Sequence, residues 1–237
     1  MKNKIGNFDQ TWNSLYSEGQ RHNNRYPFNS VIQFLFSHCP PNVPREQIRV
    51  LEVGCGAGNN LWFAAREGFK VKGIDASDVA VELAISRLRE DGLDGDIRLG
   101  DATSLPFPDA CIDLAIDRAA ITHMPKESVT KVISEVHRVL KPGGKFHFNP
   151  FGDRCSSSQR FAHDSEDESG VLTDITSGCL IGSGMASVYS RIDVENVFKN
   201  GWNLFSLTHV VYTEMNEPRF MVHEEWLALA EKNKEPY

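Results

Sequence analysis

The residues best suited to bind a ligand through their backbone lie at positions 52–60, which read E-V-G-C-G-A-G-N-N. Gly54, Gly56 and Gly58 alternate here directly after the apolar run 48–53. Glycine lets the chain turn tightly and lets a ligand approach the backbone, and a helix that follows the turn offers its first N–H groups. The pattern predicts a binding site at the end of a strand.

A carboxylate, Asp75, lies 17 residues after Gly58, at the end of a second apolar run, 71–75. This is near the spacing at which an acid accepts hydrogen bonds from a ribose, so the loop and the acid together predict a bound nucleoside. A nicotinamide dinucleotide is the rival ligand, but its loop is spaced G-x-G-x-x-G. Here the glycines are spaced G-x-G-x-G, and Asn59 and Asn60 follow. The spacing therefore argues against a nicotinamide-dependent oxidoreductase.

Alternating strand and helix signals surround these residues. Five apolar runs predict strands at 48–53, 71–75, 96–99, 112–116 and 145–148. Helical periodicity lies between them, most strongly over 126–140, and Ser77 and Gly92 are the expected ends of the helix after the second strand. Two closing strands are expected at 204–213 and 220–230, although the second segment equally fits a short helix. The pattern predicts an α/β fold with a mostly parallel, doubly wound, seven-stranded sheet and helices on both faces.

Four motifs follow the chain in a fixed order. They are Glu52-x-Gly54-x-Gly56-x-Gly58 after the first expected strand, Asp75 at the end of the second, Gly100-Asp101-Ala102 after the third, and Leu140-Lys141-Pro142-Gly143-Gly144 before the fifth. Each motif alone has an ordinary explanation as a turn, a helix cap or a helix stop. In this order the four resemble the class I, Rossmann-like S-adenosylmethionine-dependent methyltransferases of the small-molecule type, over about residues 50–148.

The resemblance implies S-adenosylmethionine as cofactor, S-adenosylhomocysteine as its product, and no metal. It places Glu52 and the three glycines at the methionine end of the pocket, Asp75 on both ribose hydroxyls, Asp101 and Ala102 beside the adenine, and Asp117 beside the methyl group. The expected cofactor-binding residues are Glu52, Gly54, Cys55, Gly56, Gly58, Asn60, Asp75, Ala76, Asp101, Ala102 and Asp117.

Methyl transfer from a sulfonium is an in-line displacement, so the protein contributes mainly alignment and exclusion of water. A hydroxyl or protonated amine acceptor must also lose a proton. His123, just past the fourth expected strand, is the first candidate base, and Asp117 is the second. The alternative for His123 is a structural role at the start of the helix that follows Pro125.

Polar and aromatic side chains outside the central strands are candidates for binding the acceptor, because loops and caps on a rigid sheet commonly carry specificity. They are Tyr16, Arg25, Tyr26, His163 and Tyr189, each of which ordinary packing or exposure would also explain. Trp12 and Trp62 are expected to pack in the core or the cap.

The chain is expected to form one domain of 237 residues. Its expected parts are an N-terminal helical cap over the sheet edge at 1–46, a cofactor-binding core at 47–151, a loop or lid at 152–187, and a C-terminal helix with the closing strands at 188–237. Ser190 and Asp193 form the expected capping box of that helix.

A net charge of -7 and the absence of an RNA-binding module argue against nucleic acid as a partner. Five cysteines without a C-x-x-C pair favour a reduced, cytoplasmic location. With no apolar stretch near 18 residues, neither a membrane span nor a signal peptide is expected. No histidines show metal-ligand spacing.

The favoured function is methyl transfer to an oxygen or nitrogen of a small molecule. The alternatives are methylation of RNA or protein, which predicts a basic rim around the pocket, and cofactor binding without turnover. The sequence leaves the acceptor and the oligomeric state open.

Overall fold

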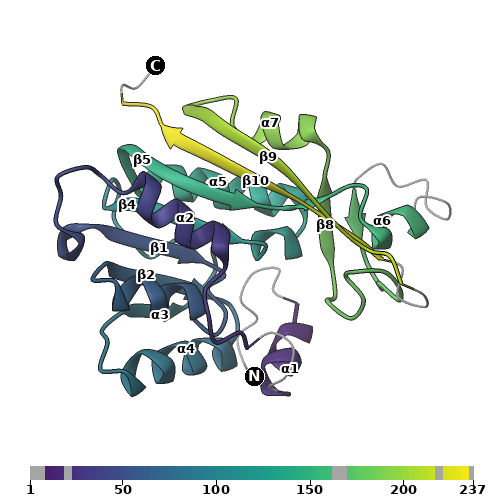
Figure 1. The fold of residues 1–237 in the computed structure, drawn as a ribbon, viewed down its shortest axis with the longest axis horizontal. Coiled ribbons are helices and arrows are strands. Elements are labelled where there is room, and N and C mark those ends of the chain that lie inside the picture. The colour runs from purple at the N-terminus through teal and green to yellow at the C-terminus, as the bar shows by residue number, and fades with distance from the viewer. Residues whose placement is uncertain (1–8, 19–22, 162–169, 217–220, 235–237) are drawn as a thin grey trace.

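A computed structural model describes residues 9–18, 23–161, 170–216 and 221–234 (Figure 1). Five parallel strands form the centre of the sheet in the order β3-β2-β1-β4-β5. They are β1 (Arg49–Val53), β2 (Lys70–Asp75), β3 (Asp96–Leu99), β4 (Ile112–Arg118) and β5 (Leu140–Asn149). The order reverses between β1 and β4, which is where open α/β sheets bind ligands at the carboxyl ends of their strands.

A long antiparallel hairpin, β9 (Trp202–Glu214) and β10 (Met221–Lys232), continues the sheet from β5. This confirms the two closing strands, which form an antiparallel hairpin, and shows a strand where a short helix was the alternative. Three short strands, β6 (Phe151–Gly152), β7 (Val171–Leu172) and β8 (Ala186–Tyr189), pair beyond β10. The described residues thus form ten strands and not seven, because part of the segment expected as a loop or lid joins the sheet.

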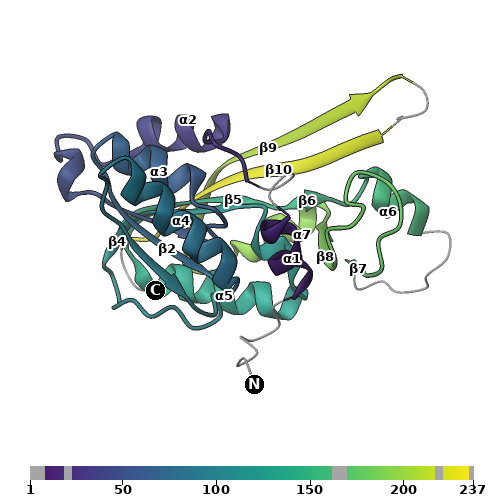
Figure 2. The ribbon, with the colours of Figure 1, turned by 90° about the horizontal axis from the view of Figure 1, so that it is seen from below.

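Helices cover both faces of the sheet, as Figure 2 shows. One face carries α2 (Asn29–His38), α3 (Asn59–Arg66) and α4 (Asp78–Glu90), and the other carries α5 (Lys126–Val139) and α7 (Arg191–Val197). The buried side of α2 packs with β1 and β4. The expected position of the N-terminal cap at the sheet edge is therefore wrong for α2, which lies on the face of the sheet.

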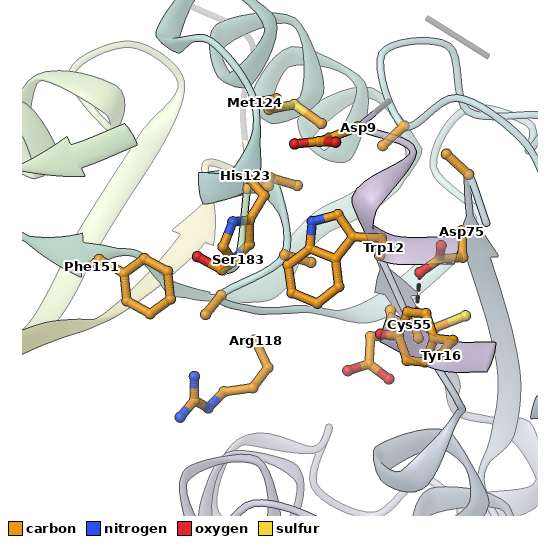
Figure 3. A pocket seen from close by; sticks show the side chains of 18 of the residues that line it. Asp9, Trp12, Tyr16, Cys55, Asp75, Arg118, His123, Met124, Phe151 and Ser183 are labelled. Carbon is orange, nitrogen blue, oxygen red and sulfur yellow. Dashed lines mark hydrogen bonds between the residues drawn. The ribbon is translucent and has the colours of Figure 1, made fainter. Parts of the chain in front are cut away.

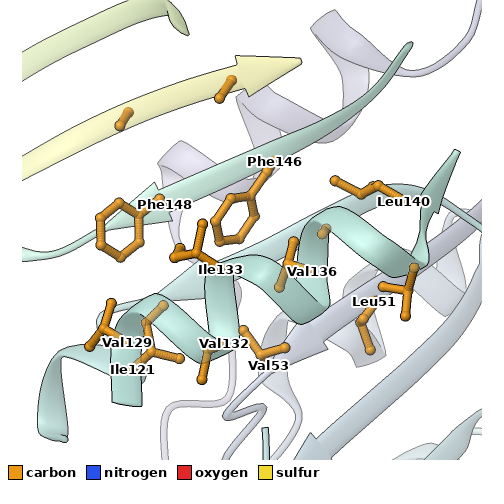
Figure 4. Close-up of a cluster of buried hydrophobic side chains, with 14 of the residues drawn as sticks. Leu51, Val53, Ile121, Val129, Val132, Ile133, Val136, Leu140, Phe146 and Phe148 are labelled. Carbon is orange, nitrogen blue, oxygen red and sulfur yellow. The ribbon is translucent and has the colours of Figure 1, made fainter. Parts of the chain in front are cut away.

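The apolar stripe of α5 forms the centre of one core layer (Figure 4). Val132 and Val136 are fully buried and pack with strand residues that include Val53 and Phe146. Fully burying such a side chain contributes about 1.5–3 kcal/mol. The helix ends at Val139 as expected, but β5 begins at once, so the K-P-G-G turn forms an irregularity inside the strand where the sequence predicted a turn before it.

The ends of the helices agree with the residues that predict them. Ser77 accepts a hydrogen bond from the backbone N–H of Ala80 at 3.1 Å, and Ser190 and Asp193 form the expected capping box. Gly92, just after α4, has the positive φ of +66° that a helix C-terminus favours.

Shorter elements lie at both ends of the parallel strands. At the carboxyl ends lie α1 (Thr11–Ser17), the 3-10 helix η2 (Ile121–His123) and α6 (Ser156–Phe161), whereas the 3-10 helix η1 (Arg45–Gln47) precedes β1 at the amino ends. α1 packs against α4, so the N-terminal segment reaches the same end of the sheet as the glycine loop. In the described ranges no helix has the length and apolar character of a membrane span.

Candidate ligand-binding site

A cavity of about 520 Å³ opens at the carboxyl ends of β1, β2 and β4, a size typical of small-molecule sites (Figure 3). It is closed over by α1 and by the loop 178–183. The structure brings most of the residues expected from the sequence to its walls. They are Tyr16, Glu52, Gly54, Cys55, Gly56, Asn60, Asp75, Ala76, Asp101, Ala102 and His123.

Four other expected residues do not line this cavity. Gly58 begins α3 with a φ of +74°, and a Cβ there would lie 2.8 Å from the Cβ of Ala84, so this glycine serves helix packing. Arg25 and Tyr26 are exposed outside the cavity. Tyr189 is buried with its ring against Phe148, because β8 became part of the sheet. His163 lies outside the described residues.

Asp117 is also absent from the cavity wall, which corrects its expected place beside the methyl group and as a base. The side chain is fully buried, and its Oδ1 accepts hydrogen bonds from the N–H groups of Ala120 and Ile121, both at 2.9 Å. Burial raises the pKa of Asp117 to about 6. Its carboxyl fixes the turn that leads into η2, so it positions His123 from beneath the site.

The glycine loop is shaped by its neighbours. Gly54 and Gly56 both have positive φ, and a Cβ on them would lie 2.2 Å from the Cβ of Ala120 and 2.3 Å from the Tyr16 hydroxyl oxygen. Asp75 fixes the loop, since its two carboxyl oxygens accept the N–H groups of Gly56 and Ser77 at 2.8 Å each. Burial raises the pKa of Asp75 despite these hydrogen bonds.

We expect Gly54→Ala to lower the free energy of unfolding by about 2–5 kcal/mol, because left-handed backbone and overpacking each cost an L side chain. Gly92→Ala is the matched control, with a φ of +66° and no heavy atom within 4 Å of a Cβ. It should cost only about 1–2 kcal/mol. Urea denaturation of both variants measures the difference, and equal losses would show that contact with Ala120 does not matter.

A buried carboxyl forms the floor of the cavity beside this loop. Glu52 Oε1 accepts a hydrogen bond from Asn60 Nδ2 at 2.7 Å, and Asn60 Oδ1 accepts the N–H of Phe28 at 3.1 Å. Among the described residues Glu52 Oε2 has no hydrogen-bond partner, so it can still receive a donor from a ligand. Burial raises the pKa of Glu52 to about 8.

This raised pKa predicts a pH-dependent stability. Between about 4.5, the ordinary pKa of Glu52, and about 8, the folded protein holds a proton that the unfolded chain releases. The free energy of unfolding should therefore fall as pH rises through this range. Glu52→Gln keeps an acceptor for Asn60 and should make the fall less steep. The remaining fall comes from Asp75, Asp117 and His223, whose raised pKa values act with the same sign. Urea titrations from pH 5 to 8 test this, and the exposed Glu82→Gln should keep the full slope.

The other half of the cavity is aromatic and apolar around His123. The His123 ring lies 4.6 Å from the Trp12 ring and 5.4 Å from the Phe151 ring, measured between centroids. His123 Nδ1 lies 2.8 Å from the carbonyl oxygen of Met185, which only accepts. The neutral ring therefore carries its proton on Nδ1 and its lone pair on Nε2. Trp12 packs in the N-terminal cap against Tyr16, as expected, and it also lines the cavity. Trp62 packs as expected and donates to Asp91 at 2.7 Å.

Several residues of this half were not predicted. Arg118 ends β4, stacks its guanidinium over Phe28 at 4.1 Å, and pairs with Glu225 at 3.2 Å. Its place just after the fourth expected strand, 112–116, was the sequence feature from which its position in the cavity could have been predicted. Others come from segments whose folding the sequence left open, and they are Asp9, Phe151, Cys179, Leu180, Ser183 and His223. In the part of the chain described, no three His, Cys, Asp or Glu side chains are grouped to hold a metal ion.

Comparison with known proteins matches residues 50–144 to a methyltransferase domain family. The chain is 38% identical over 100 residues to methyltransferase GfsG of Streptomyces halstedii, and 40% identical over 101 residues to 24-methylenesterol C-methyltransferase 2 of Oryza sativa. These matches cover 41% of this chain and only 35% and 27% of the two relatives. The range matched by the family, residues 50–144, contains the glycine loop and Asp75 and excludes α1 and the hairpin.

A solved S-adenosylmethionine-dependent methyltransferase from Methanosarcina mazei has the same fold, with a TM-score of 0.67 and 24% identity. The likeness covers 82% of this chain and 96% of that one, so it extends beyond the matched domain to most of the described elements. Residues 50–144 are therefore a methyltransferase domain, and the chain resembles S-adenosylmethionine-dependent methyltransferases in sequence there and in fold over most of its length.

Proposed function

We propose that this protein transfers a methyl group from S-adenosylmethionine to an oxygen or nitrogen of a small-molecule acceptor. The observation that carries the proposal is one continuous cavity that joins the glycine loop and Asp75 to the aromatic surroundings of His123. A nucleoside cofactor fits the first half, and an acceptor fits the second. Because both halves belong to one cavity, the two ligands can lie in direct contact.

The cofactor half has the features that S-adenosylmethionine requires. Gly54 and Gly56 leave room at the backbone that a Cβ would fill, and Asp75 offers two carboxyl oxygens to ribose hydroxyls. Glu52 adds an acceptor oxygen with no described partner beside the loop. Asp101 and Ala102 form the wall expected to flank the adenine. When bound, the cofactor supplies a sulfonium methyl group that a nucleophile can displace.

His123 is the proposed general base. The Met185 carbonyl holds the proton on Nδ1, so Nε2 is the ring atom that would accept a proton from a hydroxyl or an amine. Trp12 and Phe151 flank the ring and fix its orientation. Their apolar surfaces also exclude water, which would otherwise compete with the acceptor for the base.

The cavity wall supports a small molecule over RNA or protein. Arg118 supplies the single Lys or Arg side chain among the described lining residues, and Glu225 already pairs with it. Acidic side chains on the same wall include Asp9 and Glu52. A site for a nucleic acid would instead need unpaired basic side chains along its rim.

A carbon acceptor is the second candidate, because the rice relative is named as a C-methyltransferase. The aromatic rings of Trp12 and Phe151 support it, since ring faces stabilise the cationic species that form when an alkene carbon accepts a methyl cation. In that reaction a base is needed only to remove a proton afterwards.

The test is turnover with a panel of small acceptors. Purified protein is incubated with methyl-labelled S-adenosylmethionine and hydroxyl, amine or alkene acceptors, and S-adenosylhomocysteine and labelled product are measured by mass spectrometry. We expect acceptor-dependent product with an oxygen or nitrogen methyl group. Product from alkenes alone would favour the carbon candidate, and cofactor binding without turnover on any acceptor would contradict an enzyme.

A further inference from the structure

Two cysteines, a histidine and a glutamate meet at the acceptor end of the cavity, and the proposed methyl transfer uses none of them. Cys155 precedes α6, Cys179 lies in the loop that closes the cavity, and His223 and Glu225 lie on β10. Cys179 and His223 line the cavity, whereas Cys155 and Glu225 are buried behind them.

The fold clamps the two cysteines together. The N–H of Cys179 donates to Ser156 Oγ at 3.1 Å, and the N–H of Leu180 donates to Ser157 Oγ at 2.9 Å. Gly178 lies so close to α6 that a Cβ would be 2.4 Å from the backbone nitrogen of Ser157. The loop is thereby fixed on the two serines that follow Cys155, and the two thiols share one apolar cluster.

A chain of neighbouring side chains runs from the thiols to a buried ion pair. Cys155 lies beside Cys179, and Cys179 beside His223, close enough for each neighbour to shift the other's pKa. His223 Nε2 lies 3.4 Å from Glu225 Oε2, and Arg118 Nη2 lies 3.2 Å from the same oxygen. A buried carboxylate behind an imidazole favours the imidazolium, and the imidazolium in turn favours a thiolate beside it.

The groups around Cys155 and Cys179 shift the pKa values toward a thiolate at Cys179. Cys155 and then His223 lower the pKa of Cys179, while the pKa of Cys155 is raised. Cys179 and Glu225 raise the pKa of His223 to about 9. Cys55 also lines the cavity, but burial raises the pKa of its thiol. Of the two thiols that line the cavity, we therefore expect Cys179 to be reactive and Cys55 to be unreactive.

We propose that Cys179 is a peroxide-reactive thiol of the acceptor pocket and that Cys155 is its resolving partner. The Cys179 thiolate attacks one oxygen of hydrogen peroxide, the O–O bond breaks, and sulfenic acid and hydroxide form. Cys155, having given its proton to that hydroxide, then attacks the Cys179 sulfur. The S–S bond forms, the S–O bond breaks, and the leaving hydroxide takes a proton from solvent as water. Two electrons pass from the two sulfurs to the peroxide.

The first test is alkylation of the whole protein by iodoacetamide at pH 6, followed residue by residue with mass spectrometry. We expect Cys179 to react at least about 10-fold faster than Cys55 and Cys39, because the neighbouring His223 favours its thiolate. His223→Gln should slow Cys179 at pH 6 and restore much of its rate near pH 9. An equal rate at Cys179 and Cys39 in the wild-type protein would overturn the proposal.

The second test uses equimolar hydrogen peroxide and peptide mapping without reductant. The expected product is a Cys155–Cys179 disulfide that dithiothreitol reverses. Cys155→Ser should instead accumulate a Cys179 sulfenic acid that dimedone traps, and Cys39→Ser should behave as the wild type. Circular dichroism checks that each variant is folded. Oxidation spread over all cysteines, or confined to others, would contradict the proposal. Because both readouts are chemical, the outcome does not depend on methyl transfer.

Discussion

Asp75→Ala should leave the protein folded and weaken its binding of S-adenosylmethionine and S-adenosylhomocysteine roughly 100-fold or more. The expected interactions are two hydrogen bonds from ribose hydroxyls to the carboxylate, each contributing about 1.5–3 kcal/mol because the acceptor is charged. The substitution also frees the N–H of Gly56, which now donates to Asp75 at 2.8 Å. The glycine loop and the ribose would thus both lose the carboxylate that holds them. Isothermal calorimetry measures the resulting change in Kd.

Two variants separate this effect from general damage to the second βα turn. Asp75→Asn keeps one acceptor oxygen and should show an intermediate affinity. Asp78→Asn changes a carboxylate in the first turn of α4 that does not line the cavity, so it should bind as the wild type does. An Asp75→Ala protein that binds S-adenosylhomocysteine normally would place the ribose elsewhere.

His123→Gln should lower kcat about 100-fold to 10,000-fold, the range in which a positioned general base contributes. The affinity for the cofactor should change little, because the ring lies on the acceptor half beside Trp12 and Phe151. Steady-state kinetics on the acceptor found in the turnover screen measures kcat and KM separately.

The matched control is His137→Gln. His137 also has a ring nitrogen near a carbonyl oxygen, that of Gly201 at 3.0 Å, but it lies on α5 on the far face of the sheet. It should alter stability and leave kcat unchanged. If His123→Gln keeps full kcat, the role of this ring is packing between Trp12 and Phe151, and the acceptor loses its proton to another group or to water.

The residues that local rules govern were predictable from the sequence. The positive φ of Gly54 and Gly56, the carboxylate of Asp75 after a buried strand and the capping box at Ser190 each follow from a few neighbouring residues. The five parallel strands followed from apolar runs alternating with helical periodicity. Such features depend on sequence separations of a few residues, so no knowledge of the fold was needed.

The acceptor half depends on contacts between distant segments, which periodicity does not encode. Asp9 accepts the N–H of Met185 at 3.2 Å across most of the chain, and Gly184 leaves room for its carboxylate. β8 joined the sheet, which buried Tyr189 in the core. Asp117 was misplaced for a related reason: a residue at a strand end can face the cavity or the turn beneath it, and two backbone N–H groups turned it away.

The cofactor half and the acceptor half of the cavity also differ in how far they match known families. The part that matches the methyltransferase domain family, residues 50–144, supplies the glycine loop and Asp75. Trp12 and the loop 178–183 lie outside it and form much of the acceptor half. We therefore expect acceptor specificity to differ from that of the relatives, even where the cofactor half is the same.

The most direct test of the central claim is a calorimetric titration of the wild-type protein with S-adenosylhomocysteine, with NADH and NADPH titrated in parallel. We expect one S-adenosylhomocysteine site per chain, no heat from either nicotinamide cofactor, and a loss of the signal in Asp75→Ala. No binding of S-adenosylhomocysteine, or binding of a nicotinamide cofactor in its place, would contradict an S-adenosylmethionine site in this cavity.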